Sequence, residues 1–207
     1  RRRRRVTGPA ERRRRAGGGA CNGGAGAGWF NGNVTGVVGG KDGPGVGMGT
    51  ATYKVDAGAT NTVAAPASFS VSGDSAGHTV VYSGADAVGN ASGNSSQTVR
   101  IDGTPPPAAA LSGTRAGPTQ GSVTLNWTQA ADATSGVASF DVYKINIAGS
   151  GTPCPAAGYT LVVSGLGAGT TSYVTNVGNN AWACLYVVTS DNATNTTNSN
   201  IVKVQGK

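Results

Sequence analysis

Four aspartates in turns rich in glycine or asparagine are the residues whose type and placement could do chemistry. They are Asp42, Asp86, Asp132 and Asp191. Calcium takes oxygen ligands from such loops, but its sites usually gather several carboxylates in one short loop, and each of these turns offers one. Asp and Asn side chains also cap their own turns with no ion present. The sequence therefore favours a turn-forming role, with calcium as the weaker alternative and no other cofactor.

The sequence predicts no catalytic residues. His78 is the only histidine, and no cysteine or carboxylate stands at catalytic spacing from it. Glutamate occurs once, at Glu11, and nothing places two acids across a cleft as glycoside hydrolysis requires. We therefore predict that the protein is not an enzyme.

Two tryptophans are candidate ligand contacts. Trp29 and Trp182 could each stack on a sugar ring if exposed, although packing at a strand end is the commoner fate of such residues. Trp127 is different, because it alternates with Val123 and Leu125 along one segment. That alternation buries one face of a strand, so Trp127 is expected in a core.

Two of the three cysteines lie in the second half of the chain and are expected to pair. Cys154 lies in a loop-like insertion and Cys184 in a strand-like segment, and a disulfide between them would fix the insertion. Two separate free thiols are the alternative. A disulfide fits an oxidising, extracytoplasmic setting. Zinc is disfavoured because closely spaced Cys or His partners are missing.

Positive charge is concentrated at the start of the chain. Arg1–Arg5 and Arg12–Arg15 carry nine of the sixteen basic residues, so residues 1–20 have a net charge of +8 and residues 21–207 one of −1. We predict that residues 1–28 are a disordered basic, Gly-rich tail. Contact with an acidic envelope or membrane surface is an alternative, and nucleic-acid binding a weaker one, so no specific nucleic acid is expected. No apolar run is long enough for a transmembrane segment, and no secretory signal is visible.

The elements that must position these residues are strands. Charged residues make up 12% of the chain, glycine is 35 of 207 residues, and Val, Thr and Tyr are frequent. One order of features also occurs twice: an acidic turn, a strand with an aromatic residue, a second strand and a closing Asp-x-x-x-Asn turn. The two copies span residues 42–90 and 132–195. Such a repeat indicates tandem modules.

The predicted fold class is therefore all-β, with two tandem β-sandwiches after the tail. The first module is expected over residues 29–103 and the second over residues 104–207. The proline-rich segment 104–107 forms the linker, because consecutive prolines stop a strand ladder and keep the backbone extended.

The first module resembles the bacterial extracellular Ig-like repeat known as the OmpL47-type β-domain. The motifs that carry this resemblance are Asp42-Gly-Pro-Gly-Val46, Thr52–Asp56, Asp86-Ala-Val-Gly-Asn90 and Val99–Pro106. Residues 121–205 resemble a bacterial fibronectin type III-like module, through Leu125-Asn-Trp127, Asp132–Val137, Phe140–Lys144 and Tyr186–Asp191.

The resemblance implies a non-catalytic extracellular or cell-surface module that acts as a spacer, stalk or adhesion unit of a larger secreted protein. A carbohydrate-binding accessory module of a secreted hydrolase is the alternative. The implied partners are neighbouring modules of a longer chain, and a polysaccharide or another surface protein.

Overall fold

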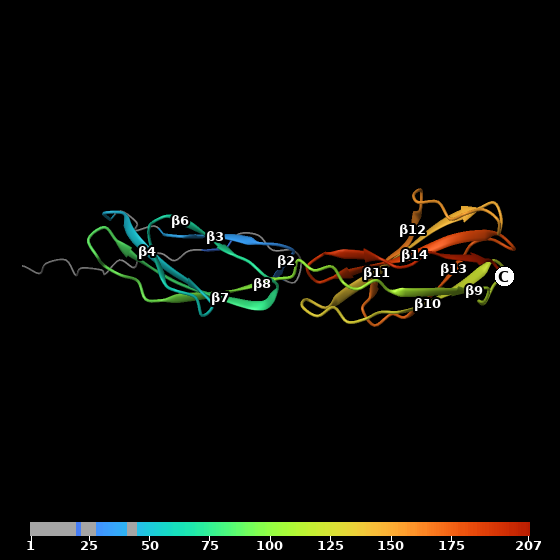
Figure 1. Ribbon diagram of the computed structural model, residues 1–207, viewed down its shortest axis with the longest axis horizontal. Coiled ribbons are helices and arrows are strands. Elements are labelled where there is room, and N and C mark those ends of the chain that lie inside the picture. Colours follow the sequence, from blue (N-terminus) through green and yellow to red (C-terminus); the bar gives the residue numbers. More distant parts are fainter. Residues whose placement is uncertain (1–19, 22–27, 41–44) are drawn as a thin grey trace, which may run out of the picture. The chain divides into compact units, whose positions relative to one another are not determined.

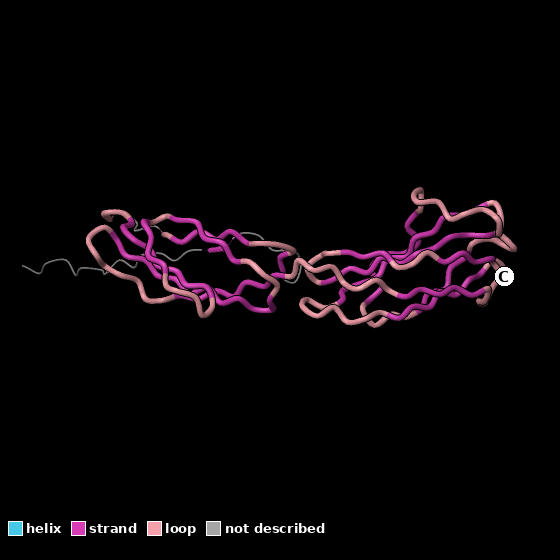
Figure 2. Tube along the Cα trace, viewed as in Figure 1, coloured by secondary structure: helices cyan, strands magenta, loops and turns pink. Residues whose placement is uncertain are grey.

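The structure is a computed structural model that describes residues 20–21, 28–40 and 45–207. These residues form strands joined by turns and loops (Figure 2), which confirms the predicted all-β class. Apart from Ala20, Cys21 and Gly28, the predicted tail lies outside the described residues. No helix among the described residues is long and apolar enough to cross a membrane.

The described strands are numbered in chain order (Figure 1). In the first half they are β1 Ala20–Cys21, β2 Trp29–Phe30, β3 Val34–Val38, β4 Met48–Val55, β5 Asn61–Ala64, β6 Ala67–Val71, β7 Ser75–Asp86 and β8 Ser95–Ile101. In the second half they are β9 Ala110–Thr114, β10 Ser122–Thr128, β11 Val137–Ile147, β12 Thr160–Gly167, β13 Ser172–Asn176, β14 Trp182–Asp191, β15 Thr196–Asn198 and β16 Val202–Gln205.

Contacts along the described chain divide it into two compact units. Unit 1 is built mainly from Val34–Val71 and His78–Val99, and unit 2 from Arg100–Lys207. Unit 2 also includes residues 28–33 and Ser72–Gly77, which come earlier in the sequence. The boundaries predicted for the two modules remain a prediction.

The strands of the first half form two sheets, ordered β1-β3-β6 and β2-β8-β7-β4-β5. β3 and β6 lie side by side and antiparallel (Figure 1). Residues of β3 alternate between buried and exposed, with Val34 and Val38 buried and Gly36 between them. The ring of Phe69 lies over Gly36 and stacks on Tyr53 at 4.8 Å between ring centroids. A glycine in β3 therefore makes room for the ring of Phe69 in its stack on Tyr53.

Gly36→Ala should destabilise unit 1. A Cβ at this position would lie 2.3 Å from Phe69 Cζ, so the aromatic ring would have to move out of its stack on Tyr53. We expect a loss of about 1–3 kcal/mol in the free energy of unfolding, measured by urea denaturation of the full chain. Gly93→Ala is the control, because nothing lies within 4 Å of its added Cβ. Equal effects of the two substitutions would contradict the steric account.

The strands of unit 2 from β9 onward form a β-sandwich. One sheet has the order β13-β10-β9, and the other has the order β12-β11-β14-β15, with β16 also pairing with β14. Val123, Leu125 and Trp127 of β10 face a core that includes Phe140 and Leu185. Trp127 is 3% exposed, and its ring centroid lies 5.4 Å from that of Phe140. The expected core position of Trp127 is confirmed.

Candidate functional site

Two aspartate turns, one in each unit, use the same hydrogen-bond network. In unit 1, Asp86 Oδ1 accepts hydrogen bonds from the backbone N–H groups of Val88 (3.0 Å) and Asn90 (2.8 Å), and Oδ2 accepts one from Asn90 Nδ2 (2.7 Å). The backbone closes the same turn, since Asp86 N donates to Asn90 O at 3.0 Å. One side chain and its partner Asn90 thus hold a five-residue turn.

The Asp191 turn of unit 2 repeats this network. Asp191 Oδ1 accepts from the N–H groups of Ala193 and Asn195, and Oδ2 accepts from Asn195 Nδ2, each at 2.8 Å. Asp191 N donates to Asn195 O at 3.1 Å. Both carboxylates are buried, at 7% exposed for Asp86 and 2% for Asp191. Buried carboxylates require such donors, and here the turn itself supplies them.

Hydrogen bonding also keeps the Asp86 carboxyl group in the unit 1 turn ionised. The side-chain hydrogen bond from Asn90, helped by backbone N–H groups, lowers the pKa of Asp86 below its ordinary value, against a smaller opposing effect of burial. Hydrogen bonds to the charged form of a carboxyl group stabilise that form. Asp86 therefore acts as an anionic turn closer at neutral pH.

The two turns differ at their fourth residue. Gly89 has a φ of 90° in the Asp86 turn, and Thr194 has a φ of 72° at the matching place in the Asp191 turn. Left-handed backbone is easy for glycine and strained for a β-branched residue. The Asp191 network therefore holds Thr194 in a conformation that the residue itself disfavours.

Thr194→Gly should stabilise unit 2 by about 0.5–1 kcal/mol, since the strain removed exceeds the entropy that glycine adds to the unfolded chain. The reciprocal change, Gly89→Thr, should destabilise unit 1 by about 1–2 kcal/mol. Urea unfolding of both variants measures these differences. Loss of stability in both variants would show that the two turns do not both favour glycine at the fourth residue.

The third described aspartate turn lies beside the second. Asp132 Oδ1 accepts hydrogen bonds from the N–H groups of Thr134 (3.2 Å), Ser135 (3.0 Å) and Gly136 (2.7 Å). Ser135 N also donates to Asp102 Oδ2 at 2.9 Å, and Asn195 Nδ2 donates to the Asp102 carbonyl at 2.8 Å. The Asp102 side chain is completely buried. Asp102 is thus held by both neighbouring turns of unit 2.

Asp102, Asp132 and Asp191 form a carboxylate cluster in which one oxygen of each lies within 4.8 Å of the others. Oxygen ligands of this kind suit a hard cation such as calcium. Backbone N–H groups donate to oxygens of all three carboxylates, and calcium remains the weaker alternative. Asp132 and Asp191 were identified as candidates from the sequence, but Asp102 was not. The feature of the sequence that could have identified Asp102 is its position just before Gly103-Thr104-Pro105. Asp42 lies outside the described residues.

The two candidate tryptophans have different surroundings. Trp29, in β2, is 8% exposed and pairs with Arg100 of β8, so its ring offers little surface to a ligand. Trp182, at the start of β14, is half-buried between Ile147 of β11 and Gln205 of β16. Of the two candidates, Trp182 has the more accessible ring.

A tyrosine group that the sequence analysis missed lies on the same face of β14 as Trp182. The rings of Tyr143 and Tyr186 are parallel, with centroids 5.2 Å apart and planes 5° from parallel, and Tyr159 meets Tyr186 edge-on at 4.9 Å. Burial raises the pKa of both Tyr159 and Tyr186. Parallel rings at this spacing are stacked on each other, so Tyr143 and Tyr186 do not form a flat coplanar platform for a sugar.

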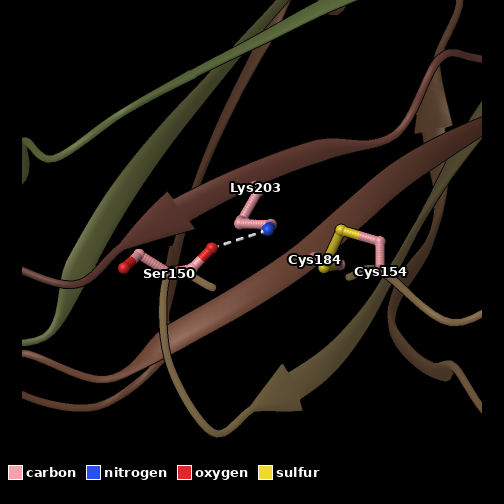
Figure 3. The surroundings of a disulfide bond; sticks show 4 residues. All are labelled: Ser150, Cys154, Cys184 and Lys203. Carbon is pink, nitrogen blue, oxygen red and sulfur yellow. Dashed lines mark hydrogen bonds between the residues drawn. A yellow bond between two sulfur atoms is a disulfide. The ribbon is translucent and has the colours of Figure 1, made fainter. Parts of the chain in front are cut away.

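The expected disulfide is present (Figure 3). Cys154 and Cys184 are joined with an S–S distance of 2.00 Å and a Cα–Cα distance of 5.8 Å. Beside it, Lys203 Nζ of β16 donates to the carbonyl of Ser150 at 2.8 Å. The loop between β11 and β12 is therefore fixed to β14 and β16 by one covalent bond and one hydrogen bond.

Removing the disulfide should destabilise unit 2. The bond joins residues 30 positions apart and restricts the unfolded chain. Losing that restriction should lower the free energy of unfolding by about 2–4 kcal/mol. The double variant Cys154→Ala, Cys184→Ala should therefore unfold at lower urea concentration. Wild-type protein treated with dithiothreitol is the control and should shift similarly. An unchanged midpoint in both samples would contradict this role.

One serine motif was overlooked by the sequence analysis. Gly73-Asp74-Ser75-Ala76-Gly77 has the Gly-x-Ser-x-Gly spacing of a nucleophile elbow, and His78 follows it. An elbow needs a sharp turn from a strand into a helix, whereas Ser75–Asp86 is one continuous strand. Ser75 Oγ accepts from Gly77 N at 3.1 Å, and His78 Nδ1 lies 2.7 Å from Asp56 Oδ2. The motif thus lacks the backbone geometry of a nucleophile.

Of the comparisons with known proteins, the match to a solved structure with a TM-score of 0.50 supports the fold. No protein-family model matches the chain, and no curated protein does. Fibronectin(III)-like modules of Clostridium thermocellum CbhA match with a TM-score of 0.50 and 11% identity, over 91% of this chain and 94% of that one. The FN1 to FN3 domains of chicken CNTN1 match with a TM-score of 0.48 and 13% identity, over 92% of this chain and 67% of theirs. A group of titin domains matches with a TM-score of 0.49 and 15% identity, over 91% of this chain and 65% of that one.

The likeness to the CbhA modules supports a fibronectin III-like fold for this chain. At 11% identity it shows nothing about the activity of the chain. The finer resemblance of the first module to the OmpL47-type repeat remains a prediction.

Proposed function

We propose that this chain is a non-catalytic extracellular or cell-surface pair of β-sandwich modules that serves as a spacer, stalk or adhesion unit of a larger secreted protein. The observation that carries the proposal is the shared aspartate network. The Asp86 and Asp191 carboxylates, which are among the best candidates for chemistry, are buried and hydrogen-bonded within their own turns. Groups used in this way close turns and are not free to attack a substrate.

The disulfide supports a location outside the cytoplasm. Disulfides persist in oxidising compartments and are rare where glutathione and thioredoxin keep thiols reduced. The Cys154–Cys184 bond ties a surface loop to a buried position of β14, where Cys184 is fully buried. Neighbouring modules of a longer chain are the first partners in this proposal, with a polysaccharide or another surface protein as the target of an adhesive role.

A carbohydrate-binding accessory module is the second candidate function. Trp182, Cys184 and Tyr186 alternate along β14, so their side chains share one face of the sheet. The half-buried ring of Trp182 is the group on this face that could stack on a sugar. The self-stacking of Tyr143 and Tyr186 is what makes this candidate the weaker one.

Binding to polysaccharides separates the two functions. The full chain, Trp182→Ala and the control Val88→Ala are incubated with insoluble polysaccharides and a glycan array in 0.5 M salt, which screens attraction between the arginine-rich segment and polyanions. Val88 is 68% exposed and belongs to unit 1, so its change leaves the Trp182 face intact. We expect no binding that depends on Trp182. Saturable binding that Trp182→Ala loses and Val88→Ala keeps would replace the spacer with the accessory module.

A further inference from the structure

The first and last strands of the unit 2 sandwich are joined by a side chain. β9 belongs to one sheet and β16 to the other, and no strand ladder connects them. Between them, Asn200 Oδ1 accepts a hydrogen bond from Leu111 N at 2.8 Å, and Asn200 Nδ2 donates to Leu111 O at 2.9 Å. The side-chain amide thus satisfies both backbone groups of Leu111, as a neighbouring strand would. We call this pair the amide clamp.

The amide clamp is anchored to the centre of its sheet. Ser199 N donates to Val187 O at 2.8 Å, and Ser199 Oγ accepts from Val187 N at 2.9 Å. Ser199 Oγ also donates to the carbonyl of Asn200 at 2.8 Å. Ser199 is 8% exposed and Val187 is fully buried in β14. The backbone that carries the Asn200 amide is therefore fixed to a central strand.

The chain enters and leaves the sandwich at opposite ends of β10. On the entry side, Ala110 of β9 pairs with Thr128 at the end of β10. On the exit side, Lys207 N donates to Ser122 O at the start of β10, at 3.1 Å. Figure 1 shows the C-terminal end beside β9, and Lys207 Nζ donates to Gly117 O, just beyond that strand.

It follows that β9 and β16 run in the same direction. Residue 111 lies beside residue 200, and a Cβ on Gly113 would lie 3.3 Å from Val202 Cγ2, so both strands advance together. When the two ends of unit 2 are pulled apart, β9 moves one way and β16 the other. The two hydrogen bonds of the amide clamp then resist together, because the load acts across both at once.

We propose that Asn200 is the mechanical clamp of unit 2, through which tension entering at β9 passes to β16. This inference rests on the proposed spacer or stalk function, in which modules in series carry load. Forced unfolding is governed by the unfolding rate and not by the equilibrium stability. A bond that breaks before the transition state raises the unfolding rate when it is removed, so losing both bonds should speed unfolding under load roughly tenfold.

Asn176 provides a matched control. Its Nδ2 donates to Gln120 O at 2.9 Å and its Oδ1 accepts from Gly178 N at 2.9 Å, so it also makes two side-chain hydrogen bonds to backbone groups in unit 2. Asn176 lies between Cys154 and Cys184, a segment that the disulfide closes into a loop. The two hydrogen bonds of Asn176 do not join β9 to β16, so they lie outside the amide clamp.

The test is constant-force unfolding of the full chain held at its two ends. Reduction by dithiothreitol lengthens only the unfolding step of unit 2, by about 100 Å for 30 residues at full extension, and so identifies that step. Under oxidising conditions we expect Asn200→Ala to shorten the lifetime of unit 2 roughly tenfold and Asn176→Ala to leave it within about twofold. Asn200→Asp, which keeps the acceptor for Leu111 N and loses the donor, should fall between wild type and Asn200→Ala.

Urea unfolding of the same variants separates a mechanical role from a general loss of stability. Similar shifts in urea for the two Ala variants, with a short lifetime under force for Asn200→Ala alone, support the clamp. Equal lifetimes of Asn200→Ala and Asn176→Ala would overturn it. That result would leave the spacer function standing, because the polysaccharide-binding assay judges that function independently. If Asn200→Ala does not fold, a wild-type lifetime in Asn200→Asp overturns the clamp as well.

Discussion

The constraint on which both units depend is that a buried carboxylate must find hydrogen-bond donors close at hand. Asp86 and Asp191 meet it within five residues, by closing the turn that follows a long central strand. An unpaired charge is unfavourable to bury, so each turn is fixed once its aspartate is inside. Because β7 and β14 lead directly into these turns, the position of the next strand follows from the same network.

This local solution suits a chain with few large apolar side chains. The described core of unit 2 is made mostly of valine, leucine and alanine, with Trp127 and Phe140 as its aromatic members. Small side chains bury little area each, and hydrophobic stabilisation scales with that area. Turn networks, the disulfide and the amide clamp add fixed points that such a core lacks. They lie at different places in the chain: at a strand end, at a loop and between the outer strands.

The sequence predicted features whose causes are local. Alternation of Val123, Leu125 and Trp127 sufficed to identify a half-buried strand, and Asp-x-x-x-Asn sufficed to identify a closed turn, because period-two burial and side-chain capping act over a few residues. The burial of Trp29 was harder to foresee, since it depends on a parallel pairing of β2 with β8 about seventy residues later. The Gly-x-Ser-x-Gly motif is the opposite case. Its spacing matches a nucleophile elbow, but its backbone is a continuous strand and not a strand-to-helix turn.

The features that could not be predicted from the sequence depend on contacts between residues far apart in the chain. Asp102 meets Ser135 and Asn195, and Asn200 meets Leu111 at a separation of 89 residues. In each case the residue type is ordinary, and its role comes from the strand order that brings it to its partner. An asparagine just before the last strand has no pattern of its own that distinguishes it from the other asparagines of the chain. It becomes a link between two sheets because β9 and β16 lie at the same edge of the sandwich without a ladder, and its side chain pairs with both backbone groups of Leu111.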